Sequence, residues 1–179
     1  MTDQSLMRLW GMRAGFAVIV LVILFFHLLP LETTPRRWAA PDLLLAFACA
    51  WSLRRPEYIP ASLLALLFLL SDMLLQRPPG LWAVLALIGC ENLKGRARGL
   101  RDGSFTAEWL TVAAIIVAIA LANRLLLTIF FVPLPNFALV LFQLAMTLLF
   151  YPLVVAVSHW GMGVRKSAPG DLDARGGRS

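Results

Sequence analysis

Six long apolar segments, separated by short polar ones, dominate the pattern of this 179-residue chain. They lie at residues 14–29, 41–53, 60–75, 81–93, 106–132 and 137–160. Their apolar residues run continuously and do not alternate as in strands, and about 20 such residues let a helix cross a bilayer. The pattern predicts an all-α, polytopic membrane protein with six transmembrane helices. Residues 1–13 form a cytoplasmic N-terminus in this prediction, and residues 161–179 a disordered cytoplasmic tail.

The second and fourth segments are the least certain spans. The second begins at Pro41-Asp42, a favourable helix start, because proline suits the first turn and a carboxylate suits the positive helix end. Each segment makes only about 20 Å of helix, less than the ~30 Å hydrocarbon core. Extension into the flanking loops, local thinning of the bilayer and a re-entrant pair are the three ways to accommodate them.

Charge adds an orientation to this pattern. The chain is 60% hydrophobic and carries a net charge of +6, and its arginines lie mostly at the ends of apolar segments rather than in one nucleic-acid-binding patch. Six spans leave three Lys and Arg residues on one side: Arg36, Arg37 and Arg77. The other side holds twelve: Arg8, Arg13, Arg54, Arg55, Lys94, Arg96, Arg98, Arg101, Arg165, Lys166, Arg175 and Arg178. The positive-inside rule then predicts six spans with both termini in the cytoplasm.

Catalytic and metal-binding motifs are missing from the sequence. Cys49 and Cys90 lie alone in separate apolar segments, without a CxxC pair, and are interpreted as small core residues. His27 and His159 fall near opposite faces of the predicted membrane and are not expected to share a site. We therefore expect no enzyme activity, no cofactor and no metal.

Polar residues inside apolar segments indicate where a site would lie, because burying them in lipid is costly. Six of them fall in the outer half of the predicted membrane: His27, Asp42, Asp72, Asn123, Arg124 and Gln143. For His27 and Asp42, a simple interfacial position is the favoured explanation. Arg124 lies deeper, and either its long side chain extends outward or it is paired. Asp72 is its best partner by depth, so we predict an Asp72–Arg124 contact or a shared polar network.

The inner ends carry two basic stretches: Arg54, Arg55, Lys94, Arg96, Arg98 and Arg101. They either fix the topology and contact anionic lipids, or form a docking surface for a cytoplasmic partner. Glu91 and Asn92 are expected to pair with Lys94 or Arg96 at a solvated helix end. The tryptophans lie near segment ends, which is typical of an interfacial belt: Trp10, Trp38, Trp51, Trp82, Trp109 and Trp160.

Residues 41–83 carry a family resemblance. A proline enters the second segment, an aromatic residue and a proline lie near its exit, an aspartate comes late in the third, and a glycine followed by a small residue opens the fourth. The matching positions are Pro41, Trp51, Pro56, Asp72, Gly80 and Ala83. This pattern resembles the rod shape-determining protein MreD family in its alphaproteobacterial form. The first, fifth and sixth segments match that family only in hydropathy.

The resemblance implies a fold and a role. The fold would be similar to the six-helix S-component of energy-coupling-factor transporters. The role would be a non-enzymatic scaffold for lateral peptidoglycan synthesis and rod cell shape, working with MreC, MreB, and RodA with its partner penicillin-binding transpeptidase. Structural or partner-contact positions would be Pro41, Asp72, Arg77, Gly80 and Arg124. The alternative is a small-molecule binding or transport subunit, for which an outward-open pocket lined by the polar network would be the sign.

Overall fold

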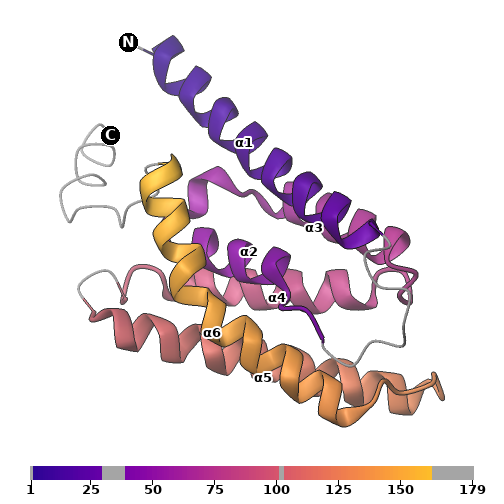
Figure 1. Ribbon diagram of the computed structural model, residues 1–179. Helices are drawn as coiled ribbons and strands as arrows, with labels where there is room; N and C mark the ends of the chain where they lie inside the picture. The colour runs from indigo at the N-terminus through magenta and orange to yellow at the C-terminus, as the bar shows by residue number, and fades with distance from the viewer. Residues whose placement is uncertain (1, 30–38, 101–102, 163–179) are drawn as a thin grey trace.

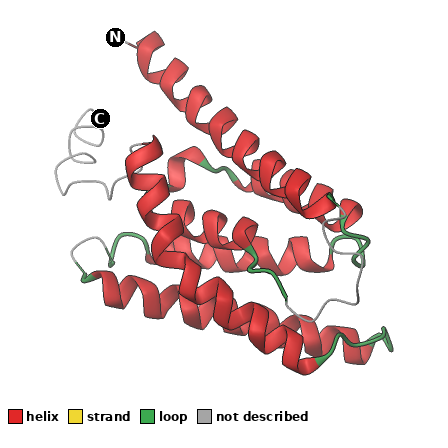
Figure 2. Ribbon diagram, in the orientation of Figure 1, coloured by secondary structure: helices red, strands yellow, loops and turns green. Residues whose placement is uncertain are grey.

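The structure is all-helical, as the apolar pattern predicts. The computed structural model describes residues 2–29, 39–100 and 103–162, and in these ranges six α-helices and one short 3-10 helix make up most of the chain (Figure 1, Figure 2). The elements are α1 (Thr2–Leu28), α2 (Leu43–Arg54), η1 (Pro56–Tyr58), α3 (Ala61–Leu74), α4 (Leu81–Arg96), α5 (Phe105–Ile129) and α6 (Phe137–Met162). The predicted disordered tail begins at residue 161, but α6 continues through Met162; residues 163–179 lie outside the described residues.

Side-chain caps define the starts of two helices. The Asp42 carboxylate accepts a hydrogen bond from the backbone N–H of Leu45 at 3.0 Å and is the N-cap of α2. The Ser104 hydroxyl accepts one from the N–H of Ala107 at 3.4 Å and caps α5. The predicted helix start at Pro41-Asp42 is confirmed, with Pro41 standing before the cap rather than in the first turn.

Three boundaries differ from the predicted segments by three residues or more. The first helix α1 begins at Thr2, so residues 2–13 continue the first apolar segment as helix instead of forming a separate N-terminal segment. In the same way, α4 continues past residue 93 to Arg96. Apolarity marks the lipid-compatible part of a helix, whereas the helix itself continues until a breaker intervenes. At the end of α5 that breaker is Phe131, whose positive φ of 54° ends the helix before the predicted residue 132.

The short helix α2 is the central element of the bundle. Its residues Leu44–Leu53 are all buried, and it packs against α4 and α6 with further contacts to α1. The Trp51 side chain is fully buried and donates a hydrogen bond from its indole nitrogen to the Ser158 hydroxyl at 3.1 Å. Trp51 therefore does not belong to an interfacial belt. A helix that is apolar on every side and enclosed by other helices is an interior helix, so α2 needs no lipid-facing surface.

Within the described ranges, three helices are long and apolar enough to cross a membrane, judged by their length and composition. They are Leu6–Leu28 within α1, Phe105–Ile129 (α5) and Phe137–Gly161 within α6. Most of their residues are not buried inside the bundle, and large apolar side chains cover their outer faces. Exposed apolar surface of this extent is characteristic of a protein in contact with lipid. The structure therefore supports a membrane protein.

Helices α4 and α5 approach each other closely at Gly89. A Cβ atom placed on Gly89 of α4 would lie 2.6 Å from Cδ1 of Ile119 and 3.0 Å from Cγ2 of Ile115, both on α5. Only a glycine lets the two helices approach this closely without displacing side chains.

Because consecutive helices alternate in direction (Figure 1), the bundle has two distinct ends. We call them the Asp42 end, where α2 starts, and the Glu108 end, where α5 starts.

Candidate functional site

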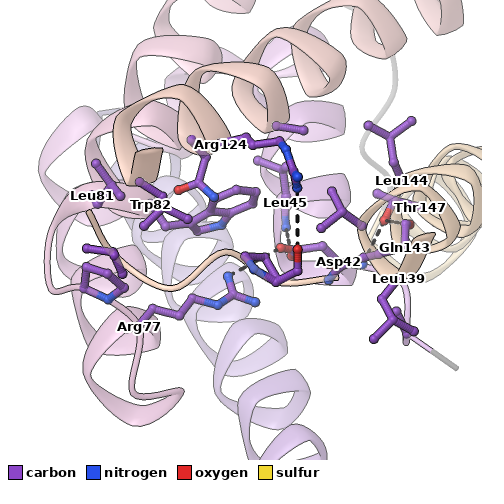
Figure 3. Close-up of a pocket in the computed structure, with 18 of the residues that line it drawn as sticks. Asp42, Leu45, Arg77, Leu81, Trp82, Arg124, Leu139, Gln143, Leu144 and Thr147 are labelled. Atoms are coloured by element: carbon purple, nitrogen blue, oxygen red, sulfur yellow. Dashed lines mark hydrogen bonds and ion pairs between the residues drawn. The ribbon is translucent and has the colours of Figure 1, made fainter. Parts of the chain in front are cut away.

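A cavity of about 500 Å³ opens at the Asp42 end of the bundle. Its walls come from the start of α2, the turn between α3 and α4, the last turns of α5 and the first turns of α6 (Figure 3). Four helices therefore contribute to one cavity, although the segments lie far apart in the sequence. We call this cavity the outer pocket, after the predicted outer side of the membrane.

Asp42 is fixed in the wall of the outer pocket by neighbours on two sides. One carboxylate oxygen caps α2, and the other lies 3.9 Å from Nη1 of Arg77. Its backbone N–H donates to Oγ1 of Thr147 at 2.9 Å, and the Thr147 hydroxyl in turn donates to the carbonyl of Gln143 at 2.7 Å. These bonds join the start of α2 to the first turns of α6 and hold the carboxylate at a defined place.

Two arginines bring positive charge to the same pocket. The guanidinium of Arg77 lies over the Trp82 ring at 5.2 Å, and that of Arg124 lies over the Phe137 ring at 4.9 Å. Arg124 also approaches the carbonyl oxygen of Pro135 at 3.5 Å, a long distance for a hydrogen bond. Neither arginine makes a short hydrogen bond to a carboxylate within the described residues. Figure 3 shows both side chains reaching into one region from different segments.

The rest of the outer pocket is mixed in character. The side chains of Asn123 and Gln143 add amide groups to its wall. Apolar residues make up the larger part of the lining: Leu45, Leu81, Ile116, Leu127, Leu139 and Leu144. A mostly apolar cavity with a few polar groups at defined positions has the general character of a small-molecule site.

The predicted outer polar network is therefore brought together in part. Asp42, Asn123, Arg124 and Gln143 all line the outer pocket, and Arg77 joins them. His27 and Asp72 are not among the lining residues: Nδ1 of His27 instead faces the carbonyl of Ile23 on its own helix at 3.3 Å.

The predicted Asp72–Arg124 contact is wrong. Asp72 is fully buried, and its Oδ2 accepts hydrogen bonds from the backbone N–H groups of Gly80 and Ala83, both at 3.0 Å. Arg124 faces Pro135 and Phe137 instead. Depth counting placed the two residues at one level in the membrane, but two residues at the same depth can face different sides of their helices.

The contacts of Asp72 define a compact unit at the turn between α3 and α4. Its carboxylate acts across the turn as a cap for the first N–H groups of α4. Gly80 adopts φ 88°, a left-handed conformation that favours glycine. Ala83 is buried, with 3% of its surface exposed. We call these three residues the Asp72 turn.

A second polar cluster, which sequence reasoning missed, lies at the Glu108 end. The fully buried Glu108 carboxylate accepts two hydrogen bonds from Arg54, at 2.9 and 3.1 Å, and one from the Tyr151 hydroxyl at 3.2 Å. The three residues come from α5, α2 and α6. A signal was present, because Glu108 is the single acidic residue within the predicted span 106–132. An acidic residue in such a segment is expected to have a partner.

The predicted basic loops are shorter than expected, since several of their residues belong to helices. Arg54 lies in the last turn of α2, and Lys94 and Arg96 lie in the last turn of α4. Lys94 donates to Glu91 at 2.7 Å and to the carbonyl of Ile59 at 2.6 Å.

The remaining basic residues are more varied. Arg96 donates to Asn92 at 2.9 Å, which confirms the second expected pairing of the α4 end. Arg55 pairs with Glu57 at 3.2 Å, and Arg98 is exposed. Arg101 lies outside the described residues.

The two cysteines are not isolated from each other in space. Cys49 on α2 and Cys90 on α4 are both fully buried, and these two helices pack against each other. The interpretation as small core residues fits their burial. Across the described ranges, no group of three or more His, Cys, Asp and Glu side chains has a metal-binding arrangement.

Comparison with protein-family models, curated proteins and solved structures finds no match to this chain.

Proposed function

We propose that this chain is an inner-membrane scaffold of the rod shape-determining MreD type. In this role it organises lateral peptidoglycan synthesis together with MreC, MreB, and RodA with its partner transpeptidase. It crosses the membrane six times with both termini in the cytoplasm, in a bundle similar to the S-component of energy-coupling-factor transporters. It has no catalytic function in this proposal.

The Asp72 turn is the observation that carries the proposal. Asp72, Gly80 and Ala83 are three of the positions on which the family resemblance rests, and they were matched one by one along the sequence. In the structure the Asp72 carboxylate accepts a hydrogen bond from the backbone N–H of each of the other two. The three positions lie within residues 72–83, on the two sides of one turn, and the aspartate, the glycine and the small residue each have a structural role there. The pattern therefore has a physical basis in this chain.

The arrangement of the helices supports six spans. The alternating helix directions (Figure 1) are those that six consecutive crossings require. The short second span, one of the two least certain of the predicted set, is α2, whose length of about 18 Å suits an interior helix better than one surrounded by lipid. The excess of Lys and Arg on one predicted side supports cytoplasmic termini.

Partner contacts are proposed on the long helices. The outer face of α5 exposes Leu121 and Leu125, each at 62%, and the outer face of α6 exposes Leu149 at 67%. Within a bilayer, apolar helix faces of this kind pack against lipid or against the spans of other membrane proteins. We propose that part of this surface holds the membrane helices of MreC and RodA.

The experiment is depletion of the protein in its host bacterium, with complementation by variants. Depleted cells should become round, and a copy carrying Asp72→Ala should fail to restore rods. Asp72→Asn is the matched control, because an amide oxygen can still accept the two N–H groups, and it should restore them. Crosslinking followed by co-purification should recover MreC with the wild-type chain. Depleted cells that keep a normal rod shape would contradict the proposal.

A second candidate function is small-molecule binding or transport, and the outer pocket favours it. The pocket gathers four of the six predicted polar residues with Arg77 and leaves both arginines without a short carboxylate bond. If Arg124→Gln abolished binding of a small molecule by the purified protein and left cell shape intact, this function would stand apart from the scaffold.

A further inference from the structure

We propose that the outer pocket binds an amphiphile by its single anionic head group, a phosphate or a carboxylate, held between Arg77 and Arg124. The inference rests on the second candidate function and names its ligand class. It is separate from the scaffold proposal, because it requires only that the bundle folds and the pocket is accessible.

The charges of the pocket favour an anion. Among the described residues of its wall, two arginines face one carboxylate, that of Asp42. One Asp42 oxygen is already used to cap α2, and the other is 3.9 Å from Arg77, too far for a hydrogen bond. Asp42 therefore offsets the arginines only in part, and their N–H groups remain available to a ligand.

Aromatic rings hold the two guanidinium groups in place. Trp82 lies under Arg77 and Phe137 under Arg124, at 5.2 and 4.9 Å. A guanidinium stacked on a ring keeps its N–H groups at the edge, in the plane where they donate to an anion. Arginine also binds planar carboxylates and phosphate oxygens through two parallel hydrogen bonds. Because the aromatic rings already hold both arginine side chains, a ligand has to order them less when it binds.

The apolar lining of the pocket would contact the apolar part of the ligand. Leu81, Leu139 and Leu144 form walls beside the charged region, as Figure 3 shows. A cavity of about 500 Å³ lies within the range of small-molecule sites. It suits a head group with a short apolar chain. A membrane phospholipid would place only its head group in the pocket and leave its chains outside. A free alkyl phosphate would place both its phosphate and its alkyl chain in the pocket.

The test uses the full-length protein in nanodiscs of phosphatidylcholine, titrated with octyl phosphate below its micellar concentration. Octyl glucoside has the same alkyl chain without the charge and serves as the matched ligand. We expect saturable heat of binding for octyl phosphate and at least about ten-fold weaker binding for octyl glucoside, since a hydrogen bond to a charged group contributes about that factor. Arg124→Gln and Arg77→Gln should each weaken octyl phosphate binding about ten-fold. Arg98→Gln, an exposed arginine on the opposite end of the bundle, should leave it unchanged.

Competition with an anionic lipid distinguishes a lipid head group from a free amphiphile as the natural ligand. Replacing part of the phosphatidylcholine by phosphatidylglycerol should suppress octyl phosphate binding if the natural ligand is a lipid head group, and should leave it unchanged if the ligand is a free amphiphile. Equal binding of both octyl compounds would refute the proposal that the ligand carries an anionic head group, although the pocket would still be a binding site. Binding of neither compound to protein in either bilayer would overturn the binding function itself. The comparison of the two ligands needs no variant, so it stands even if an arginine variant fails to fold.

Discussion

Replacing Glu108 by glutamine should lower the free energy of unfolding by about 3 kcal/mol. The carboxylate is fully buried and receives hydrogen bonds from Arg54 and Tyr151. Removing one partner of a buried ion pair costs about 3–5 kcal/mol, because the other charge stays buried without compensation. Arg54 keeps 10% of its side chain exposed, so water solvates part of that charge and the lower end of the range applies.

Reversible unfolding by sodium dodecyl sulfate in mixed micelles measures this difference. A loss of 3 kcal/mol corresponds to an unfolding equilibrium constant about 150-fold larger than that of the wild type. Glu91→Gln is the control, because Glu91 is 46% exposed in its ion pair with Lys94 and should change stability by less than about 1 kcal/mol.

A double variant separates the ion pair from other effects at the site. Adding Arg54→Met to Glu108→Gln removes the uncompensated charge and should restore part of the lost stability. The reasoning is refuted if Glu108→Gln is as stable as the wild type, or if the two substitutions lower stability additively.

Three further substitutions or treatments test the packing. Gly89→Val should lower stability by about 1–3 kcal/mol in the same assay, because its side chain meets Ile119 of α5; stability equal to the wild type would exclude the close α4–α5 contact. Asp72→Ala should cost about 1–3 kcal/mol, since two N–H groups lose their acceptor, and Asp72→Asn much less; equal losses would show that the cap is unimportant. Cys49 and Cys90 should react with a maleimide, read by mass spectrometry, only after denaturation, since both are buried; rapid labelling of the folded protein would contradict this.

Much of the fold follows from the sequence, because helix formation and continuous apolar runs are local properties. The order of the helices and the cap at Asp42 are examples. The central place of α2 does not follow, since a helix that is apolar on all sides suits lipid and a protein interior equally well. Only the length of α2, which is too short to cross the bilayer, indicates a protein interior rather than lipid.

The candidate site could be predicted only in part. Position along the chain gives depth in the membrane, and this grouped Asp42, Asn123, Arg124 and Gln143 correctly. It gives no direction around the helix axis, and Asp72 therefore received the wrong partner.

The enclosed position of α2 constrains how the protein is made. Its hydrogen bonds to α6 join Asp42 to Thr147 and Trp51 to Ser158, across 105 and 107 residues of chain. While the ribosome is still making the earlier helices, α2 has no cover on that side, and it is too short to rest alone in a bilayer. The bundle can therefore reach its final form only after the last helix has left the translocon. A messenger truncated before α6 would yield a membrane-inserted but unfinished chain, a ready substrate for membrane proteases.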